Sequence, residues 1–226
     1  MTPHGLVSLP DVGAFLSRLV RLDAATVVRL RPAPDAGRVD LWAPLPWGVL
    51  VGRAVAGTFD ADATVSAAAL FEEVARGGSV LPPRRDADWH WPLPPAGGPG
   101  ARVVESVPAV EIRRVAAAAA GTLRTASTEG VGGRAVGQRA LRDALLDHVA
   151  IVVTDEREVS VDVSQRLVQA VVRMGFLGPP EVAEATSIDV RVSGRWIGLA
   201  APYGVAWLPP AQQFALKPTR THPFVR

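Results

Sequence analysis

The sequence predicts an α+β protein that is made of two small subdomains joined by a linker. The class follows from apolar residues at helical spacing, which alternate along the chain with runs of β-branched residues. The division follows from six prolines between residues 77 and 102, which are interspersed with glycines. We therefore expect an N-terminal subdomain over 1–80, a Pro/Gly-rich linker over 81–102 and a C-terminal subdomain over 103–226.

The N-terminal subdomain is predicted to be a β-hairpin flanked by helices. From Val12 to Val20, apolar residues recur every three or four positions, which is typical of an amphipathic helix. Two β-branched runs are joined by the turn-like residues 34–37, and Gly77 ends the helical run that follows. The expected order is helix, strand, strand and helix, over 10–22, 26–32, 38–55 and 64–76.

The C-terminal subdomain is predicted to contain three helices and a hairpin. The expected helices cover 109–125, 135–148 and 163–174, and the expected strands cover 150–154, 187–199 and 204–208. This order, with a hairpin that turns at Gly194, resembles a winged helix-turn-helix domain. The resemblance implies that the helix before the hairpin enters the major groove of DNA. The implied nucleic-acid-binding residues are Gln165, Arg166, Gln169 and Arg173 on that helix and Arg191 and Arg195 in the wing.

The charge distribution opposes DNA binding by that helix. Residues 143–189 carry three arginines and nine acidic residues, whereas the segments on either side, 102–142 and 190–226, are net positive. We expect four acidic side chains at the entrance to the helix to repel phosphates: Asp155, Glu156, Glu158 and Asp162. A winged-helix shape used for protein contacts is therefore at least as well supported as one that reads DNA.

The overall composition limits the possible chemistry. The chain has 226 residues and no cysteine, which excludes disulfides, thiolate-bound metals and thiol nucleophiles. It has 24 basic and 22 acidic residues, and every basic residue except Lys217 is an arginine. Much arginine, alanine and valine with almost no lysine is typical of a GC-rich bacterial genome, so the arginines alone do not indicate an anionic partner.

The densest cluster of aromatic and polar residues lies in the proline-rich segment. His90 stands between Trp89 and Trp91, where it could act as a general base between two stacking surfaces. The favoured interpretation is that the indole rings anchor the segment to a domain surface. These three residues form a weak candidate ligand-binding set.

A second weak candidate is the glycine-rich run at 130–133. Glycines before a helix can present backbone N–H groups to a phosphate, and three arginines follow: Arg134, Arg139 and Arg142. No strand is predicted before the run, and the Lys-Ser/Thr pair of a phosphate-binding loop is absent. We therefore favour a connector.

No pattern supports a particular reaction. The four histidines are far apart in the sequence, and neither a metalloprotease pair nor a nucleophile elbow is present. We predict no catalytic residue, no metal ligand and no cofactor, and an enzyme is the less favoured class.

Two short segments are similar to each other. Pro46-Trp47-Gly48-Val49 and Pro202-Tyr203-Gly204-Val205 each follow a helix and a strand in the predicted order. A duplicated helix–strand–strand unit would explain the match. Chance matching in a chain rich in valine, alanine and proline is the favoured explanation.

The predicted function is that of a non-enzymatic bacterial regulatory or protein-interaction protein, whose partner is another protein or a second copy in a homodimer. The alternative is a winged-helix DNA-binding transcriptional regulator. No membrane partner is expected, because the longest uncharged stretch, 196–216, is interrupted by three prolines. The first residues lack the pattern of a secretory signal, so the expected location is the cytoplasm.

Overall fold

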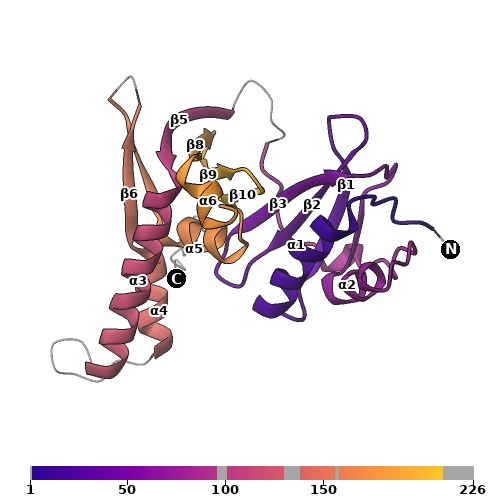
Figure 1. Cartoon of the computed structure of the whole chain (residues 1–226), viewed down its shortest axis with the longest axis horizontal. Helices are drawn as coiled ribbons and strands as arrows, with labels where there is room; N and C mark the ends of the chain where they lie inside the picture. The colour runs from indigo at the N-terminus through magenta and orange to yellow at the C-terminus, as the bar shows by residue number, and fades with distance from the viewer. Residues whose placement is uncertain (1, 96–100, 130–137, 156–157, 211–226) are drawn as a thin grey trace, which may run out of the picture.

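The computed structural model describes residues 2–95, 101–129, 138–155 and 158–210 (Figure 1). The helices are α1 (Leu9–Leu22), α2 (Ala67–Ala75), α3 (Ala109–Glu129), α4 (Gln138–Asp147), α5 (Gln165–Arg173) and α6 (Pro180–Glu184), with a 3-10 turn η1 at Asp86–Asp88. The strands are β1 (Val27–Pro32), β2 (Arg38–Pro44), β3 (Leu50–Ala56), β4 (Ala63–Ser66), β5 (Ala101–Pro108), β6 (Val149–Thr154), β7 (Ser160–Ser164), β8 (Ser187–Ser193), β9 (Trp196–Ala201) and β10 (Gly204–Leu208).

One sheet of eight antiparallel strands runs through both halves of the chain. Its order is β4-β1-β2-β3-β10-β9-β8-β5, and β6 and β7 form a separate hairpin. At the centre, β3 of the first half pairs with β10 of the second half, with Leu50 opposite Trp207 and Gly52 opposite Val205. This pairing joins the meander β1–β3 to the meander β8–β10.

The helices cover one face of this sheet. Along β2 the residues Val39, Leu41 and Ala43 are buried, and the residues between them are only partly buried, as expected for a strand with one face against the core. Figure 1 shows α1 and α2 across the first meander, while α5 packs on β9 and β10.

Two phenylalanines fill the space beneath the central pair of strands. The rings of Phe15 on α1 and Phe176 after α5 are stacked, with centroids 6.3 Å apart and planes 7° apart. Both side chains are fully buried. At the start of β10 a Cβ on Gly204 would lie 2.6 Å from the Phe176 ring and 2.8 Å from the carbonyl oxygen of Gly52, so only glycine lets the strands close on this core.

The prediction of a winged-helix-like C-terminal domain over 103–226 is wrong, although the α+β class fits. The hairpin β8–β9 does turn at Gly194, but a wing is a short projecting hairpin, whereas these strands lie inside a larger sheet. β10 pairs with β3, and β5, which was predicted as linker and loop, pairs with β8. The local pattern could not show this, because β3 and β10 are far apart in the sequence. The buried side chains of both halves form one continuous core, and the boundaries at 80 and 103 stay a prediction.

Three local assignments also differ from the prediction. The segment 38–55 is two strands, β2 and β3, that are separated by a tight turn. The segment 64–76 begins as strand β4, and the Ser66 hydroxyl caps α2 by accepting a hydrogen bond from the backbone N–H of Ala69. Residues 160–164 form strand β7, where Val161 and Val163 are buried and alternate with polar residues. The helix that was predicted from 163 therefore begins only at Gln165.

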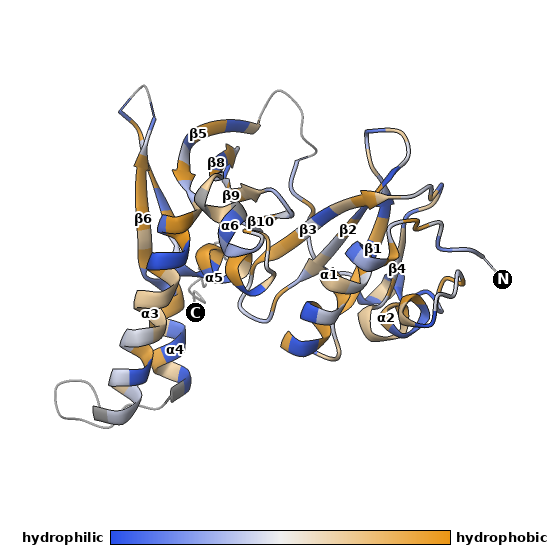
Figure 2. Cartoon of the chain, viewed as in Figure 1, coloured by the Kyte–Doolittle hydropathy of each residue, from blue (hydrophilic) through white to orange (hydrophobic). Residues whose placement is uncertain are grey.

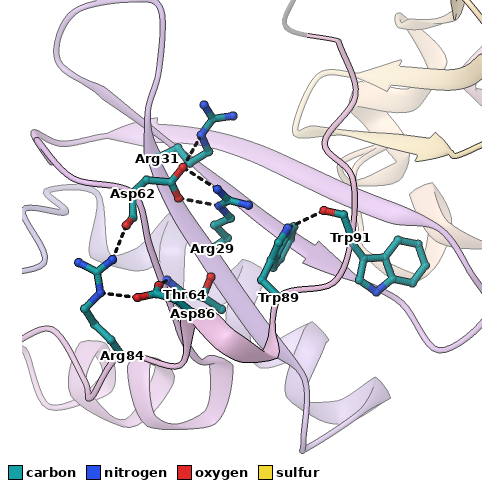
Figure 3. A network of polar contacts seen from close by, with 8 residues as sticks. All are labelled: Arg29, Arg31, Asp62, Thr64, Arg84, Asp86, Trp89 and Trp91. Atoms are coloured by element: carbon teal, nitrogen blue, oxygen red, sulfur yellow. Dashed lines mark hydrogen bonds and ion pairs between the residues drawn. The ribbon is translucent and has the colours of Figure 1, made fainter.

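The described part of the proline-rich segment is attached to the N-terminal half (Figure 3). Asp62 pairs with Arg29 at 2.6 Å and with Arg31 at 3.0 Å. Asp86 accepts hydrogen bonds from the Arg84 guanidinium at 2.6 Å and from the backbone N–H of Thr64 at 2.8 Å. Arg84 also forms an isolated antiparallel β-bridge with Val65 of β4, so the segment covers the outer edge of that strand.

Trp89 completes this attachment. The Arg29 guanidinium lies 5.4 Å from the centre of its indole ring, and the indole N–H donates to the carbonyl oxygen of Trp91 at 2.6 Å (Figure 3). Anchoring of the segment by an indole ring, the favoured interpretation of the sequence, agrees with this geometry at Trp89.

The substitution Gly52→Ala tests the packing of the sheet. A Cβ at this position would lie 2.5 Å from the Trp42 ring on the neighbouring strand, so the indole has to move. We expect a loss of about 1–3 kcal/mol in the free energy of unfolding, measured by urea denaturation. Gly13→Ala is the control, because its Cβ would meet no atom closer than 3.8 Å. A loss at position 13 as large as that at position 52 would contradict the packing argument.

The substitution Asp86→Asn tests the attachment of the proline-rich segment. The hydrogen bonds from Arg84 and from the Thr64 N–H lower the pKa of Asp86. A lowered pKa in the folded state stabilises the protein above the pKa of the unfolded state, and this contribution is lost as the pH falls through the folded-state pKa. Wild type should therefore exceed the variant in free energy of unfolding by up to about 1 kcal/mol at neutral pH, with the difference decreasing as the pH falls through the folded-state pKa.

Urea denaturation across this pH range measures that difference. Asp60→Asn is the control, because Asp60 is exposed and has no ion pair within the described ranges. A difference that is independent of pH, or the same for both variants, would count against the attachment.

Candidate binding site at the junction of the two halves

Two aromatic turns connect the halves reciprocally. Trp47 lies in the turn between β2 and β3, and the Arg173 guanidinium of α5 is 5.9 Å from the centre of its ring. Tyr203 lies in the turn between β9 and β10, and the Arg53 guanidinium of β3 is 5.7 Å from its ring centre. Each aromatic residue therefore receives an arginine from the other half. Both turns join the second and third strands of a meander, and these equivalent positions support the interpretation of the two segments as a duplicated unit.

Arg166 holds the first of these turns in place. The indole N–H of Trp47 donates to the carbonyl oxygen of Arg166 at 3.1 Å, and the Arg166 guanidinium donates back to the carbonyl oxygen of Trp47. The same guanidinium donates to Asp147 at the end of α4 at 2.7 Å. One side chain thus ties the β2–β3 turn to both α4 and α5.

Two open hollows flank this connection. The first, here named the Gln165 hollow, has a volume of about 490 Å³ and is formed by α1, α3, α4, α5 and the β2–β3 turn. Its lining consists of Arg21, Leu22, Pro46, Trp47, Ala119, Ala120, Leu123, Arg142, Leu145, Leu146, Gln165, Gln169 and Arg173. The second, the His90 hollow, has a volume of about 700 Å³, and its lining consists of Gly48, His90, Trp91, Pro92, Asp147, Ser164, Arg166, Leu208, Pro209 and Pro210.

The His90 hollow brings together polar groups but no reacting pair. His90 is exposed, and no hydrogen bond joins it to Ser164 or Asp147 in the described part of the chain. The Asp147 carboxylate is already engaged by Arg166.

The residues described here also contain no group of three side chains that could hold a metal ion. Within these ranges, every helix is too short or too polar for a transmembrane segment.

The predicted nucleic-acid-binding set is divided by the fold. Gln165, Gln169 and Arg173 line the Gln165 hollow, whereas Arg166 lines the His90 hollow. Arg191 and Arg195 belong to the hairpin β8–β9, where Arg191 pairs with Asp189 at 2.9 Å and Arg195 is exposed at the turn. These six residues therefore do not form one surface made of a recognition helix and a wing.

The weak ligand-binding set is also divided. His90 and Trp91 line the His90 hollow, while Trp89 packs under Arg29 and belongs to neither hollow. Arg142 lines the Gln165 hollow. Arg139 is exposed on α4 and lines neither hollow, and Arg134 lies outside the described residues.

The acidic residues expected at the entrance to α5 lie elsewhere. Asp155 and Glu158 close the turn of the hairpin β6–β7, at the end remote from α5 (Figure 1), and Asp155 pairs with Arg102 at 2.7 Å. Asp162 is in the middle of β7, and Glu156 lies outside the described residues. Strand β7 lies between the hairpin turn and α5, so Asp155 and Glu158 are not at the entrance to the helix.

The sequence analysis missed an exposed apolar edge. Val103 on β5, Val152 on β6 and Val159 before β7 are 49%, 58% and 51% exposed. The ion pair between Arg102 and Asp155 holds β5 close to the hairpin, and Figure 2 shows β6 as a predominantly hydrophobic strand. We name these three residues the valine edge. The strand at 150–154 was predicted, and the alternation of valines at 159–163 could have indicated its partner, β7.

Comparison with known protein families also divides the chain into two parts. Residues 94–213, just over half of the chain, match the family DUF8185, described as a domain of unknown function. The chain belongs to this family. Residues 4–93 of this DUF8185 protein match a second family, DUF8010, which is also described as a domain of unknown function. The sequence matches no curated protein.

Solved structures resemble the DUF8185 protein in fold. The Helicobacter pylori β clamp in complex with carprofen aligns with a TM-score of 0.52 and 10% identity, over 89% of this chain and 62% of that one. The DNA polymerase III subunit β of Pseudomonas aeruginosa aligns with a TM-score of 0.51 and 11% identity, over 88% of this chain and 62% of that one. The fold is thus that of these clamps, and the chain spans less than two thirds of their length.

Proposed function

We propose that this DUF8185 protein is a non-enzymatic protein-interaction protein that associates with a second copy of itself through the valine edge. The observation that carries the proposal is the exposure of about half of each of these three valine side chains, two of which lie on strands with open edges and the third just before β7. The clamp fold supports a role in protein interaction near the DNA replication machinery.

The backbone of the valine edge supports pairing with another chain. β5 is the last strand of the large sheet, and its partner is β8. β6 and β7 pair with each other, and no third strand joins them within the described residues. Strands with unpaired N–H and C=O groups and apolar side chains readily take another strand. A second copy would cover both the valines and these backbone groups.

The substitution Val152→Lys tests the association. An ammonium group in the contact has to be desolvated, so we expect dissociation of the dimer to become at least about tenfold easier. Light scattering after size-exclusion chromatography over a range of concentrations measures the change. Val7→Lys is the matched control, since Val7 is 73% exposed and its backbone N–H donates to the carbonyl oxygen of Ala56 in the N-terminal half. A wild type that stays monomeric at high concentration, or an equal effect of both variants, would overturn the proposal.

Duplex DNA is the second candidate partner. The location of Asp155 and Glu158 favours it, because these two carboxylates lie at the hairpin tip and not in the lining of the Gln165 hollow, to which Arg142 and Arg173 belong. A positive surface of this kind binds phosphates with an affinity that falls as salt is added.

Retention on duplex DNA tests this candidate. DNA binding predicts retention at low salt that falls steeply toward physiological salt, and a severalfold loss for Arg173→Ala. Arg191→Ala is the control, because Asp189 already pairs with that guanidinium. The absence of retention at low salt would exclude the candidate.

A further inference from the structure

The Gln165 hollow contains a buried donor without an acceptor. Gln165 is 3% exposed, and its Nε2 has no hydrogen-bond partner. A buried amide without a partner lowers stability, so such groups are rare unless something else uses them. Gln165 is among the residues that line this hollow and a neighbouring one between α3 and α4.

The rim of the hollow is positively charged and uncompensated. Arg21, Arg142 and Arg173 come from three different helices, and the lining includes no acidic residue. None of the three forms an ion pair with a carboxylate within the described ranges. Burial and the neighbouring charges of Arg21 and Arg53 lower the pKa of Arg18, one turn before Arg21, which agrees with a locally positive potential.

The walls of the hollow are apolar. Four leucines, two alanines, a proline and a tryptophan line it: Leu22, Leu123, Leu145, Leu146, Ala119, Ala120, Pro46 and Trp47. A volume of about 490 Å³ lies within the range of ligand pockets, which is roughly 300–1,000 Å³. The hollow therefore combines aliphatic walls, three cations at the rim and one buried amide donor.

We propose that the Gln165 hollow binds an acidic, apolar peptide segment of a protein partner. A carboxylate of the segment pairs with the guanidinium groups of Arg142 and Arg173. An aliphatic side chain of the segment packs against the leucines, and a backbone carbonyl oxygen accepts the hydrogen bond from Gln165 Nε2. Such a peptide has a complementary group for the arginines, for the leucines and for the amide of Gln165.

A peptide fits this lining better than a nucleic acid backbone. Phosphates would pair with the arginines but would leave the four leucines covered by sugar and solvent. The Trp47 ring is covered by Arg173, so it is not free to stack on a base. The site is distinct from the valine edge, and peptide binding does not depend on self-association.

Retention of peptide pools on the immobilised full chain tests the proposal. The acidic pool consists of hexapeptides with aspartate or glutamate at two positions and leucine, isoleucine, valine or phenylalanine at two others. A neutral pool carries asparagine and glutamine in place of the acids. We expect members of the acidic pool to be retained at least about tenfold more strongly than their neutral counterparts.

Variants locate the binding. The double variant Arg142→Gln/Arg173→Gln should lose at least about tenfold in retention of the acidic pool. Arg139→Gln/Arg195→Gln is the matched control, because it removes two exposed arginines that line neither hollow. Gln165→Leu should also lose retention while its thermal midpoint stays equal or rises, because the unpartnered amide is removed.

Four results would overturn the proposal. These are an absence of preference for the acidic pool, an equal loss in the control double variant, a fall in the thermal midpoint of Gln165→Leu without loss of retention, or displacement of the pool by a duplex DNA whose own binding is lost in Arg142→Gln/Arg173→Gln. The last result would assign the arginines to nucleic acid. Light scattering of Val152→Lys reports on the valine edge separately, so failure of one proposal is distinguishable from failure of the other.

Discussion

The structure depends on the pairing of β3 with β10. These two strands are distant in sequence, and their hydrogen bonds turn two three-stranded meanders into one sheet. The pairing is stabilised by packing on the core face of the two strands. Beneath it, Phe15 and Phe176 stack in the core, and the glycine at 204 lets the backbone approach that close. A bulky residue at position 204 would separate the strands and open the core of both halves.

The same junction creates the places where ligands can bind. Joining two units leaves irregular space where their turns and helix ends meet, and pockets occur preferentially in such positions. Arg166 partly fills this space by bonding the carbonyl oxygen of Trp47 and the carboxylate of Asp147. The space that remains forms one hollow with polar groups around His90 and another with arginines around Gln165.

The surfaces proposed for binding differ in physical character. The valine edge offers open backbone groups and apolar side chains, which suit a second copy of the same strands. The Gln165 hollow offers cations and an amide donor around aliphatic walls, which suit an acidic segment with an aliphatic side chain. We therefore propose different partners for the two surfaces: a second copy of the chain at the valine edge and another protein at the Gln165 hollow.

The amino-acid sequence alone determined the local elements with strong periodicity. The apolar stripe of α1 and the β-branched runs of β1 and β10 were correctly predicted, because each pattern is set by neighbours in the chain. Only the tertiary structure decided the order of strands in the sheet and the set of residues that line the site. The winged-helix prediction failed because it depended on that order. Gln165, Gln169, Arg142 and Arg173 were candidates from sequence, but their meeting with Arg21 and Trp47 depends on packing between helices that are remote in sequence. No local pattern encodes which distant strand or helix will be adjacent, since that choice is made by burial in a shared core.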